Sequence, residues 1–426
     1  MTLAIFLGVL LTAIMLRLPV AFALLLSSIA MMFYMDSFSV DILAQSLING
    51  VDSFPLLAIP FFLVAGEVMS VGGLSTRIVR MATTFVGHRK GGLGYVAIFT
   101  SVLLAGLSGS AVADAAALVS ILYPMMKQAG YPEGRSMGLL ASGGIIAPVI
   151  PPSLPLILVG VAGGISIKDL FLGGIVPGIL MGLTLIIVWS VLIRNEDLPI
   201  APKASVAEKL SSLREGVWAL LLPVIIIGGI RFGVFTPTEA AVVAAVYALV
   251  VSTFIYRELT WAKLYTVLTN AGRATAMVMF LVGCAMVAAW LITVAQLPQQ
   301  LAGLLGPLID SPRTLMLVIM LLVLAVGMVM DLAPTVLILV PLLMPVVKLA
   351  GIDPVYFGLM FVINCSIGLI TPPVGNVLNV VCGVGRVPMS KAVTGVFPFI
   401  MAYLVLLGLF VAFPDIIIVP MNIIIG

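Results

Sequence analysis

The chain has 426 residues, of which 62% are hydrophobic and 9% charged, and its mean hydropathy is +1.30. Soluble domains carry roughly 25% charged residues, so this composition excludes a soluble globular fold. Membrane spans of about 20 residues each would use nearly all of the apolar sequence and leave almost none for an extramembrane domain. The net charge of +3 therefore means less than the places where the basic residues lie.

The apolar sequence contains few reactive side chains. The three cysteines, Cys284, Cys365 and Cys382, lie in apolar runs and indicate neither a disulfide framework nor a cysteine metal site. No nucleotide-binding loop, metal-ligand spacing or nucleophile constellation occurs, so we predict that the protein is not an enzyme. The opening apolar run lacks a basic leader region, and a second apolar run follows Pro19 instead of a cleavage site, which predicts a first membrane helix.

The predicted elements follow one order in each half of the chain. Two scaffold spans precede a short amphipathic arm, a third span, a weakly amphipathic piece, two apolar arms around a glycine-rich break, a span broken at its prolines, and a last span. In the first half these elements are residues 2–16, 19–35, 40–50, 53–71, 74–87, 91–126, 134–164 and 170–194. In the second half they are residues 217–231, 237–256, 258–269, 273–295, 297–309, 313–347, 355–385 and 391–413. Only the stretch between the halves, Arg194 to Glu215, is polar enough to be a linker.

Matching residues recur at a nearly constant distance along the chain. Pro19 and Pro237 open corresponding helices 218 residues apart, and the Pro-Pro pairs at 151–152 and 372–373 are 221 residues apart. One three-residue insertion reconciles the two offsets. Apolar sequences also resemble one another by chance, but ordered matches at prolines, a lysine and glycines favour an internal repeat. The predicted division is a first repeat over residues 1–195, a cytoplasmic linker over 196–216 and a second repeat over 217–426.

The distribution of basic residues tests the topology. If the two arms form a re-entrant hairpin, each half crosses the membrane five times, and this odd number makes the halves inverted copies. Cytoplasmic loops are enriched in Lys and Arg. With the N-terminus outside, sixteen of the 20 basic residues face the cytoplasm: Arg17, Arg77, Arg80, Arg89, Lys90, Lys127, Arg135, Arg194, Lys203, Lys209, Arg214, Arg257, Lys263, Arg273, Arg386 and Lys391. We therefore predict an all-α polytopic membrane protein of two inverted repeats, each with a re-entrant hairpin and a discontinuous helix, and with both termini in the periplasm.

Four breaks at membrane depth are the places where chemistry can occur, because backbone leaves the helix there only if protein buries it or a watery cavity receives it. They are the hairpin tips at 105–110 and 326–331 and the span breaks at 147–153 and 368–374. Helix ends leave carbonyls with partial negative charge, and helix starts offer amides with partial positive charge. Carbonyls and hydroxyls can coordinate a dehydrated sodium ion, and helix starts can receive a carboxylate. Two related sites follow, one in each half.

Few acidic residues lie in the apolar segments. Asp114 follows the first tip and Asp331 lies at the second, where a carboxylate could carry a proton or a cation or could stabilise a helix start. Glu239 has the spacing of a capping box with Thr236, which favours a capping role. The role of Glu67 stays open, and His88 belongs to a basic flank that acts as an orientation signal.

The repeat and its motifs resemble a known family. The tip GLSGSAVADAAAL (106–118) and the breaks APVIPPS (147–153) and GLITPPVG (368–375) are similar to those of the large membrane subunit, the M-type permease, of tripartite ATP-independent periplasmic (TRAP) transporters. The resemblance implies an elevator-type symporter in a bacterial inner membrane that uses two or more sodium ions and no organic cofactor. It also implies a small four-helix membrane subunit and a periplasmic substrate-binding protein that delivers an organic anion. The first span begins at Thr2, so the small subunit is expected to be a separate chain.

The resemblance also implies site residues. The sodium-site positions carried over are Ala105, Gly106, Ser108, Ala147 and Ile150 in the first half and Gly327, Gly368, Thr371 and Val374 in the second. The candidate substrate contacts are Ser110, Ser153 and Asn376. Three of the sodium positions, Ala147, Ile150 and Val374, can offer only carbonyl groups.

The substrate class is a small carboxylate. The family imports sialic acid (N-acetylneuraminate), C4-dicarboxylates and other carboxylated sugars or keto acids, and the sequence looks most similar to the sialic acid members. The alternatives are a proton- or sodium-coupled carboxylate transporter that needs no binding protein, a channel, and an intramembrane enzyme. The missing catalytic constellations count against the enzyme, and the symmetric hairpins count against a simple pore.

Overall fold

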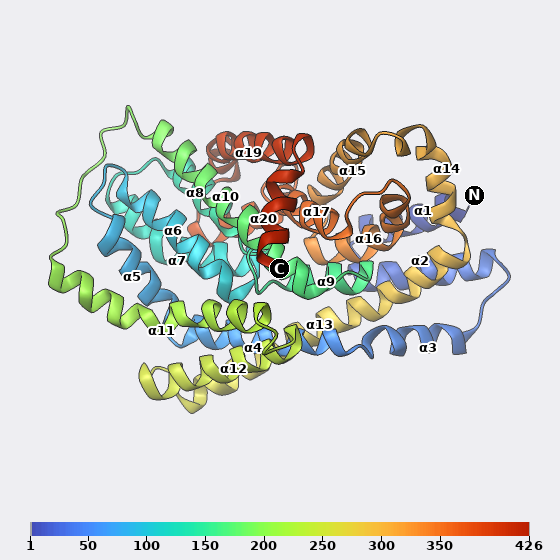
Figure 1. The fold of residues 1–426 in the computed structure, drawn as a ribbon, viewed down its shortest axis with the longest axis horizontal. Coiled ribbons are helices and arrows are strands. Elements are labelled where there is room, and N and C mark those ends of the chain that lie inside the picture. Colours follow the sequence, from blue (N-terminus) through green and yellow to red (C-terminus); the bar gives the residue numbers. More distant parts are fainter. Residues whose placement is uncertain (1, 426) are drawn as a thin grey trace.

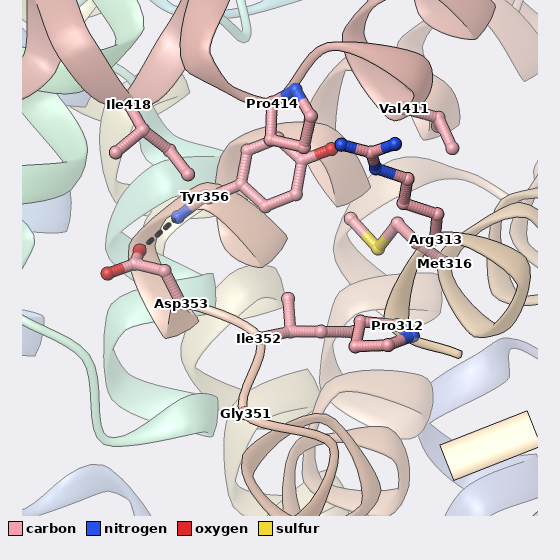
Figure 2. A pocket seen from close by; sticks show the side chains of 10 residues that line it. All are labelled: Pro312, Arg313, Met316, Gly351, Ile352, Asp353, Tyr356, Val411, Pro414 and Ile418. Atoms are coloured by element: carbon pink, nitrogen blue, oxygen red, sulfur yellow. Dashed lines mark hydrogen bonds between the residues drawn. The ribbon is translucent and has the colours of Figure 1, made fainter. Parts of the chain in front are cut away.

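The computed structural model describes residues 2–425, and over this range the chain is helical with irregular connections and no strands (Figure 1). Within these residues seven helical segments are long and apolar enough to cross a membrane: Phe54–Val71, Ile167–Leu192, Val206–Arg231, Pro237–Ile255, Trp261–Val294, Leu332–Leu349 and Met389–Ala412. The predicted all-α polytopic architecture is confirmed.

The two halves contain the same kinds of helix in the same order. The first half comprises α1 (Thr2–Met15), α2 (Val20–Tyr34), α3 (Val40–Val51), a 3₁₀ turn (Phe54–Leu57), α4 (Ala58–Val71), α5 (Leu74–Val86), α6 (Gly92–Ser108), α7 (Ala111–Gln128), α8 (Glu133–Gly144), α9 (Leu154–Gly163) and α10 (Ile167–Leu192). The second half comprises α11 (Val206–Arg231), α12 (Pro237–Val250) with a π-turn (Val251–Ile255), α13 (Trp261–Val294), α14 (Leu297–Ile309), α15 (Pro312–Gly327), α16 (Leu332–Leu349), α17 (Pro354–Gly368), α18 (Asn376–Gly385), α19 (Met389–Ala412) and α20 (Asp415–Ile425).

One predicted boundary is wrong. The arm at 258–269 and the span at 273–295 form the single helix α13, whereas their counterparts α3 and α4 are separate helices. The first half carries Pro55 within the 3₁₀ turn at this junction, and proline removes the amide donor that a continuing helix needs. The second half has Arg273 at the corresponding position, so the helix continues and is the long diagonal element of Figure 1.

Two further elements differ from the predicted ones. The polar stretch between the halves is irregular only up to Ala204, because Ser205 and Glu208 form a capping box that begins α11 at Val206. The chain also ends in a short helix, α20, which packs on α10 of the first half (Figure 1).

The polar contacts divide the helices into two groups. We call residues 2–86 and 206–309 the frame group, and residues 92–192 and 312–425 the site group. Within 2–425, every hydrogen bond between side chains or loops that are far apart in the sequence joins residues of one group or attaches the site group to residues 193–205. Arg77 and Arg80 of α5 pair with Glu258 and Glu215 inside the frame group at 2.6 and 2.7 Å. The contacts between the groups are therefore contacts without such polar ties.

The site group unites the two halves. Glu133 at the start of α8 pairs with Lys391 of α19 at 2.8 Å and with Lys127 of α7 at 3.4 Å. These bonds, the one to Lys391 above all, hold the pKa of Glu133 below its usual range. Beneath this pair α8 and α19 approach through glycines: a Cβ added at Gly395 would lie 1.9 Å from the Gly134 carbonyl oxygen.

Replacement of Gly395 by alanine should therefore destabilise the protein. The added methyl group overlaps backbone and not a flexible side chain, so α8 and α19 must separate, at a cost of about 1–3 kcal/mol for an overpacked core. Thermal unfolding in detergent measures the effect. Gly408→Ala on the same helix is the control, because no atom lies within 4 Å of a Cβ there, and an unfolding temperature lowered equally by both variants would contradict the packing argument.

Candidate functional site

The first hairpin turns at two residues. Helix α6 continues through Ser108, Gly109 adopts a left-handed φ of 63°, and Ser110 caps α7 by accepting a hydrogen bond from the Ala113 amide at 3.4 Å. Glycine enters this left-handed region without steric cost, as the sequence predicts for a tight tip. The predicted tip at 105–110 is therefore mostly helix, and its residues Ala105 to Ser108 form the last turn, whose carbonyls lack intrahelical partners.

The first tip packs on the break of the same half. A Cβ at Gly109 would lie 2.8 Å from the Pro152 carbonyl oxygen and 2.9 Å from the Cα atom of Ser153. The break covers residues 145–153 between α8 and α9, and α10 holds its other side, since a Cβ at Gly174 would lie 2.3 Å from the Val149 carbonyl oxygen. Contact with glycines on both sides keeps this non-helical backbone in place.

The second half builds the same arrangement. Helix α15 ends at Gly327 and α17 ends at Gly368, and a Cβ at Gly368 would lie 2.6 Å from the Gly327 carbonyl carbon. The Gly375 amide, just before α18, donates a hydrogen bond to the Met328 carbonyl at 3.4 Å. Tip and break are therefore in backbone contact here too.

The two sites lie in one body. The second arm of each hairpin packs on the second half of the broken span from the other repeat: α7 on α18, and α16 on α9. A Cβ at Gly163 of α9 would lie 2.9 Å from the Cε atom of Met344 of α16. Each hairpin thus belongs to both sites, and this exchange could not be read from the sequence.

The predicted sodium-site residues occupy helix ends and breaks. Ala105, Gly106 and Ser108 lie in the last turn of α6, Gly327 and Gly368 end their helices, and Ala147, Ile150, Thr371 and Val374 lie in the breaks. Most are buried, with Ala105 and Ala147 at 0% and 1% exposure. The Thr371 hydroxyl donates to the Ile367 carbonyl at 2.7 Å, and the Asn379 side chain donates to the Val374 carbonyl at 2.7 Å. In the second half, a hydroxyl and a carbonyl of the predicted set thus already have protein partners.

The predicted substrate contacts differ in availability. The Ser153 hydroxyl is fully buried and donates to the Pro148 carbonyl, so it holds the break together. Ser110 caps α7. Asn376, the first residue of α18, is half-buried, and its side chain makes no hydrogen bond within the described part of the chain. Asn376 is therefore the one of the three whose side chain is not already committed.

Asp114 is the acidic residue most closely tied to a predicted site. The Ser108 hydroxyl donates to Oδ1 of Asp114, whereas Oδ2 is buried without a partner among the described residues. Asp331, by contrast, is exposed and caps α16, accepting from the Leu332 amide at 2.9 Å. Glu239 completes the predicted capping box with Thr236. The two aspartates, which the sequence presents as equivalent candidates, have different surroundings.

One polar residue that the sequence analysis missed lies beside the second site. Asn364 of α17 is fully buried and donates to the Met320 carbonyl of α15, which fastens the outer arm of the second hairpin to the broken span. An asparagine within the apolar run FVINCSIG is the signal that could have revealed it.

Comparison with known proteins identifies the family. Residues 7–416 match the family model described as "Tripartite ATP-independent periplasmic transporter, DctM component". The chain belongs to this family. It is 58% identical over 99% of both chains to the 2,3-diketo-L-gulonate TRAP transporter large permease protein of Escherichia coli. It is 40% identical to the sialic acid TRAP transporter large permease protein of Vibrio cholerae, over 93% of each chain.

Membership in the DctM family makes this a multi-pass inner-membrane transporter permease. The greater similarity to the diketogulonate permease corrects the expectation that the sequence is most similar to sialic acid members. The fold is also similar to the crystal structure of the Alcanivorax borkumensis YdaH transporter, with a TM-score of 0.63 over 87% of this chain and 88% of that one at 16% identity.

Proposed function

We propose that the protein is the large permease of a three-component, sodium-coupled importer of a small organic anion. The observation that supports this most is the pairing of each hairpin tip with the break of its own half inside one body. This arrangement brings helix ends and helix starts, with opposite partial charges, to two related places. Carbonyls of Ala105, Gly106, Ala147 and Ile150 suit a sodium ion in the first site.

We infer an elevator-type movement of the site group against the frame group. The two groups share no hydrogen bond or ion pair between residues distant in the sequence, over the part of the chain that the structure describes. Where the first tip meets the frame, the contacts are small: a Cβ at Gly66 of α4 would lie 3.6 Å from the Cα atom of Ser108, and one at Gly106 would lie 3.2 Å from Pro223 of α11. Smooth apolar contact permits sliding without breaking fixed polar bonds.

The proposed substrate is a carboxylated sugar or keto acid, because the E. coli relative is named for 2,3-diketo-L-gulonate. Sialic acid and C4-dicarboxylates remain the other candidates. The start of α18 at Asn376, whose side chain is uncommitted, is suited to a carboxylate. The alternative function is a carboxylate transporter, coupled to protons or sodium, that works without a binding protein.

Uptake into vesicles under imposed gradients tests the coupling ion. We expect uptake to require an inward sodium gradient, and Asp114→Asn to weaken the response to sodium because it removes negative charge beside Ser108. Asp331→Asn, at the exposed cap, is the comparison and should have the smaller effect. Full uptake driven by a proton gradient alone and abolished by Asp114→Asn would instead make Asp114 the proton carrier.

The proposed orientation places both termini in the periplasm and the linker in the cytoplasm. A cysteine at Ala201, which is exposed in the linker, should react with a membrane-impermeant thiol reagent only after the membrane is opened. Val234→Cys, at a position 65% exposed between α11 and α12, should react in intact cells. The native cysteines are free but buried, so their background is small, and the reverse labelling pattern would refute the inverted arrangement.

A further inference from the structure

A cavity lies beside the linker at the end of the molecule that carries most of the basic residues. Its volume is about 900 Å³, and it is bounded by α5, by the adjoining ends of α6 and α7, and by residues 199–204. Trp189 and Tyr131, whose rings stack at 6.2 Å, lie at this same end, and the Trp189 indole donates to the Gly91 carbonyl at 3.0 Å. Such aromatic residues are typical of the membrane–water interface.

The cavity carries uncompensated positive charge. Of the charged residues that line it, Arg80 pairs with Glu215 at 2.7 Å, and Glu208 accepts a hydrogen bond from the Ser205 amide at 2.7 Å in the α11 capping box. Lys203 is exposed and takes part in none of the ion pairs found within residues 2–425.

His88 adds a second unused polar group. It lines the cavity, and its Nδ1 atom is buried without a hydrogen-bond partner among the residues described. Arg89 and Lys90 follow it directly in the sequence. The cavity rim is therefore basic, and two of its polar side chains await a partner.

The walls are apolar and open. Ile200 of the linker is 65% exposed and Met125 of α7 is 39% exposed, although both line the cavity. Val79, Leu93 and Ile121 complete this apolar lining. Exposed apolar side chains beneath a basic rim match a molecule that has a hydrocarbon part and an anionic head.

We propose that this cavity binds an anionic phospholipid of the inner leaflet, with its phosphate against His88 and Lys203 and an acyl chain along Ile200 and Met125. The proposal rests on the cytoplasmic orientation of the linker given above. The inner leaflet supplies such lipids, and basic pockets at helix ends on this side attract their headgroups. A bound lipid would join α5 of the frame group to α7 of the site group.

Native mass spectrometry of the full chain in detergent tests the site. Phosphatidylglycerol, phosphatidylcholine and inorganic phosphate are titrated separately, and phosphatidylglycerol alone should bind tightly. The double variant His88→Gln, Lys203→Gln should bind it at least about fivefold more weakly, the loss expected for one basic charge near an anionic headgroup. Lys263→Gln, at an exposed position outside the cavity, is the control and should bind like the unchanged protein.

Three results would overturn the proposal: equal binding of phosphatidylcholine, unchanged phosphatidylglycerol affinity in the double variant, or binding of inorganic phosphate alone with the same dependence on Lys203. Thermal unfolding of each variant shows whether it is folded. This assay needs neither transport nor a sodium gradient nor a sealed membrane, so its outcome is independent of the proposed import function.

Discussion

Alanine at Gly368 is expected to abolish sodium-coupled uptake. Its methyl group would lie 2.6 Å from the Gly327 carbonyl carbon and 2.9 Å from the Gly327 oxygen, so the second tip and the second break must move apart. Displacement of a binding geometry by about 1 Å can cost on the order of 100-fold in rate, and we expect a loss of this size in the initial rate of uptake into vesicles.

Other glycines of the second half provide graded comparisons. Alanine at Gly327 should cost less, because its Cβ would meet Cys365 at 3.5 Å and Gly368 at 3.6 Å, which is ordinary contact. Gly383→Ala on α18 is the control outside the site, since no atom lies within 4 Å of a Cβ there. Equal losses in all three variants, or normal uptake by Gly368→Ala, would show that the close approach of tip and break has no role in transport.

Hydroxyl removal offers a milder test of the same sites. Ser108→Ala and Thr371→Ala should raise the sodium concentration needed for half-maximal uptake, and Ser108→Ala should have the larger effect because its hydroxyl also binds Asp114. Thr371 donates to the Ile367 carbonyl within its own turn, so its loss leaves the surrounding backbone in place.

Omission of either proposed partner is expected to prevent uptake at low substrate concentration. The longest irregular stretch between described helices is the linker of residues 193–205, so no loop can form a domain that captures a dilute anion. A binding protein raises the local substrate concentration at the site, and its loss should lower uptake on the order of 100-fold. Vesicle uptake with each component left out in turn measures the effect.

The structure suggests where the small membrane subunit would be needed. Large apolar side chains of α1, α2 and α12 are exposed, among them Leu11, Phe22 and Val246 at 56%, 51% and 54%. Contact with a second membrane chain along these helices would brace the frame group. Full uptake by the isolated chain would exclude the three-component system and leave a self-sufficient carboxylate transporter.

Much of the fold could be predicted from the sequence because the physical signals are local. Low charge and long apolar runs indicate membrane helices, and the glycine of the tip and the prolines of the breaks disrupt helices wherever they stand. The wrong boundary at residues 258–295 follows from the same rule, since the second half has no counterpart of Pro55 and α13 continues. The start of α11 was missed because the capping box at Ser205 lies inside a polar stretch that resembled a linker.

The sequence by itself determined the class of protein, the order of the helices and the four places where the backbone breaks, because composition and helix-breaking residues act on the chain locally. Only the tertiary structure decided which segments meet. Each tip packs on the break of its own half, each hairpin arm packs on the other half, and Asp114 binds Ser108 while Asp331 caps a helix. These contacts join residues far apart in the chain, and their geometry depends on close backbone approach at glycines such as Gly109 and Gly368, which no local pattern encodes.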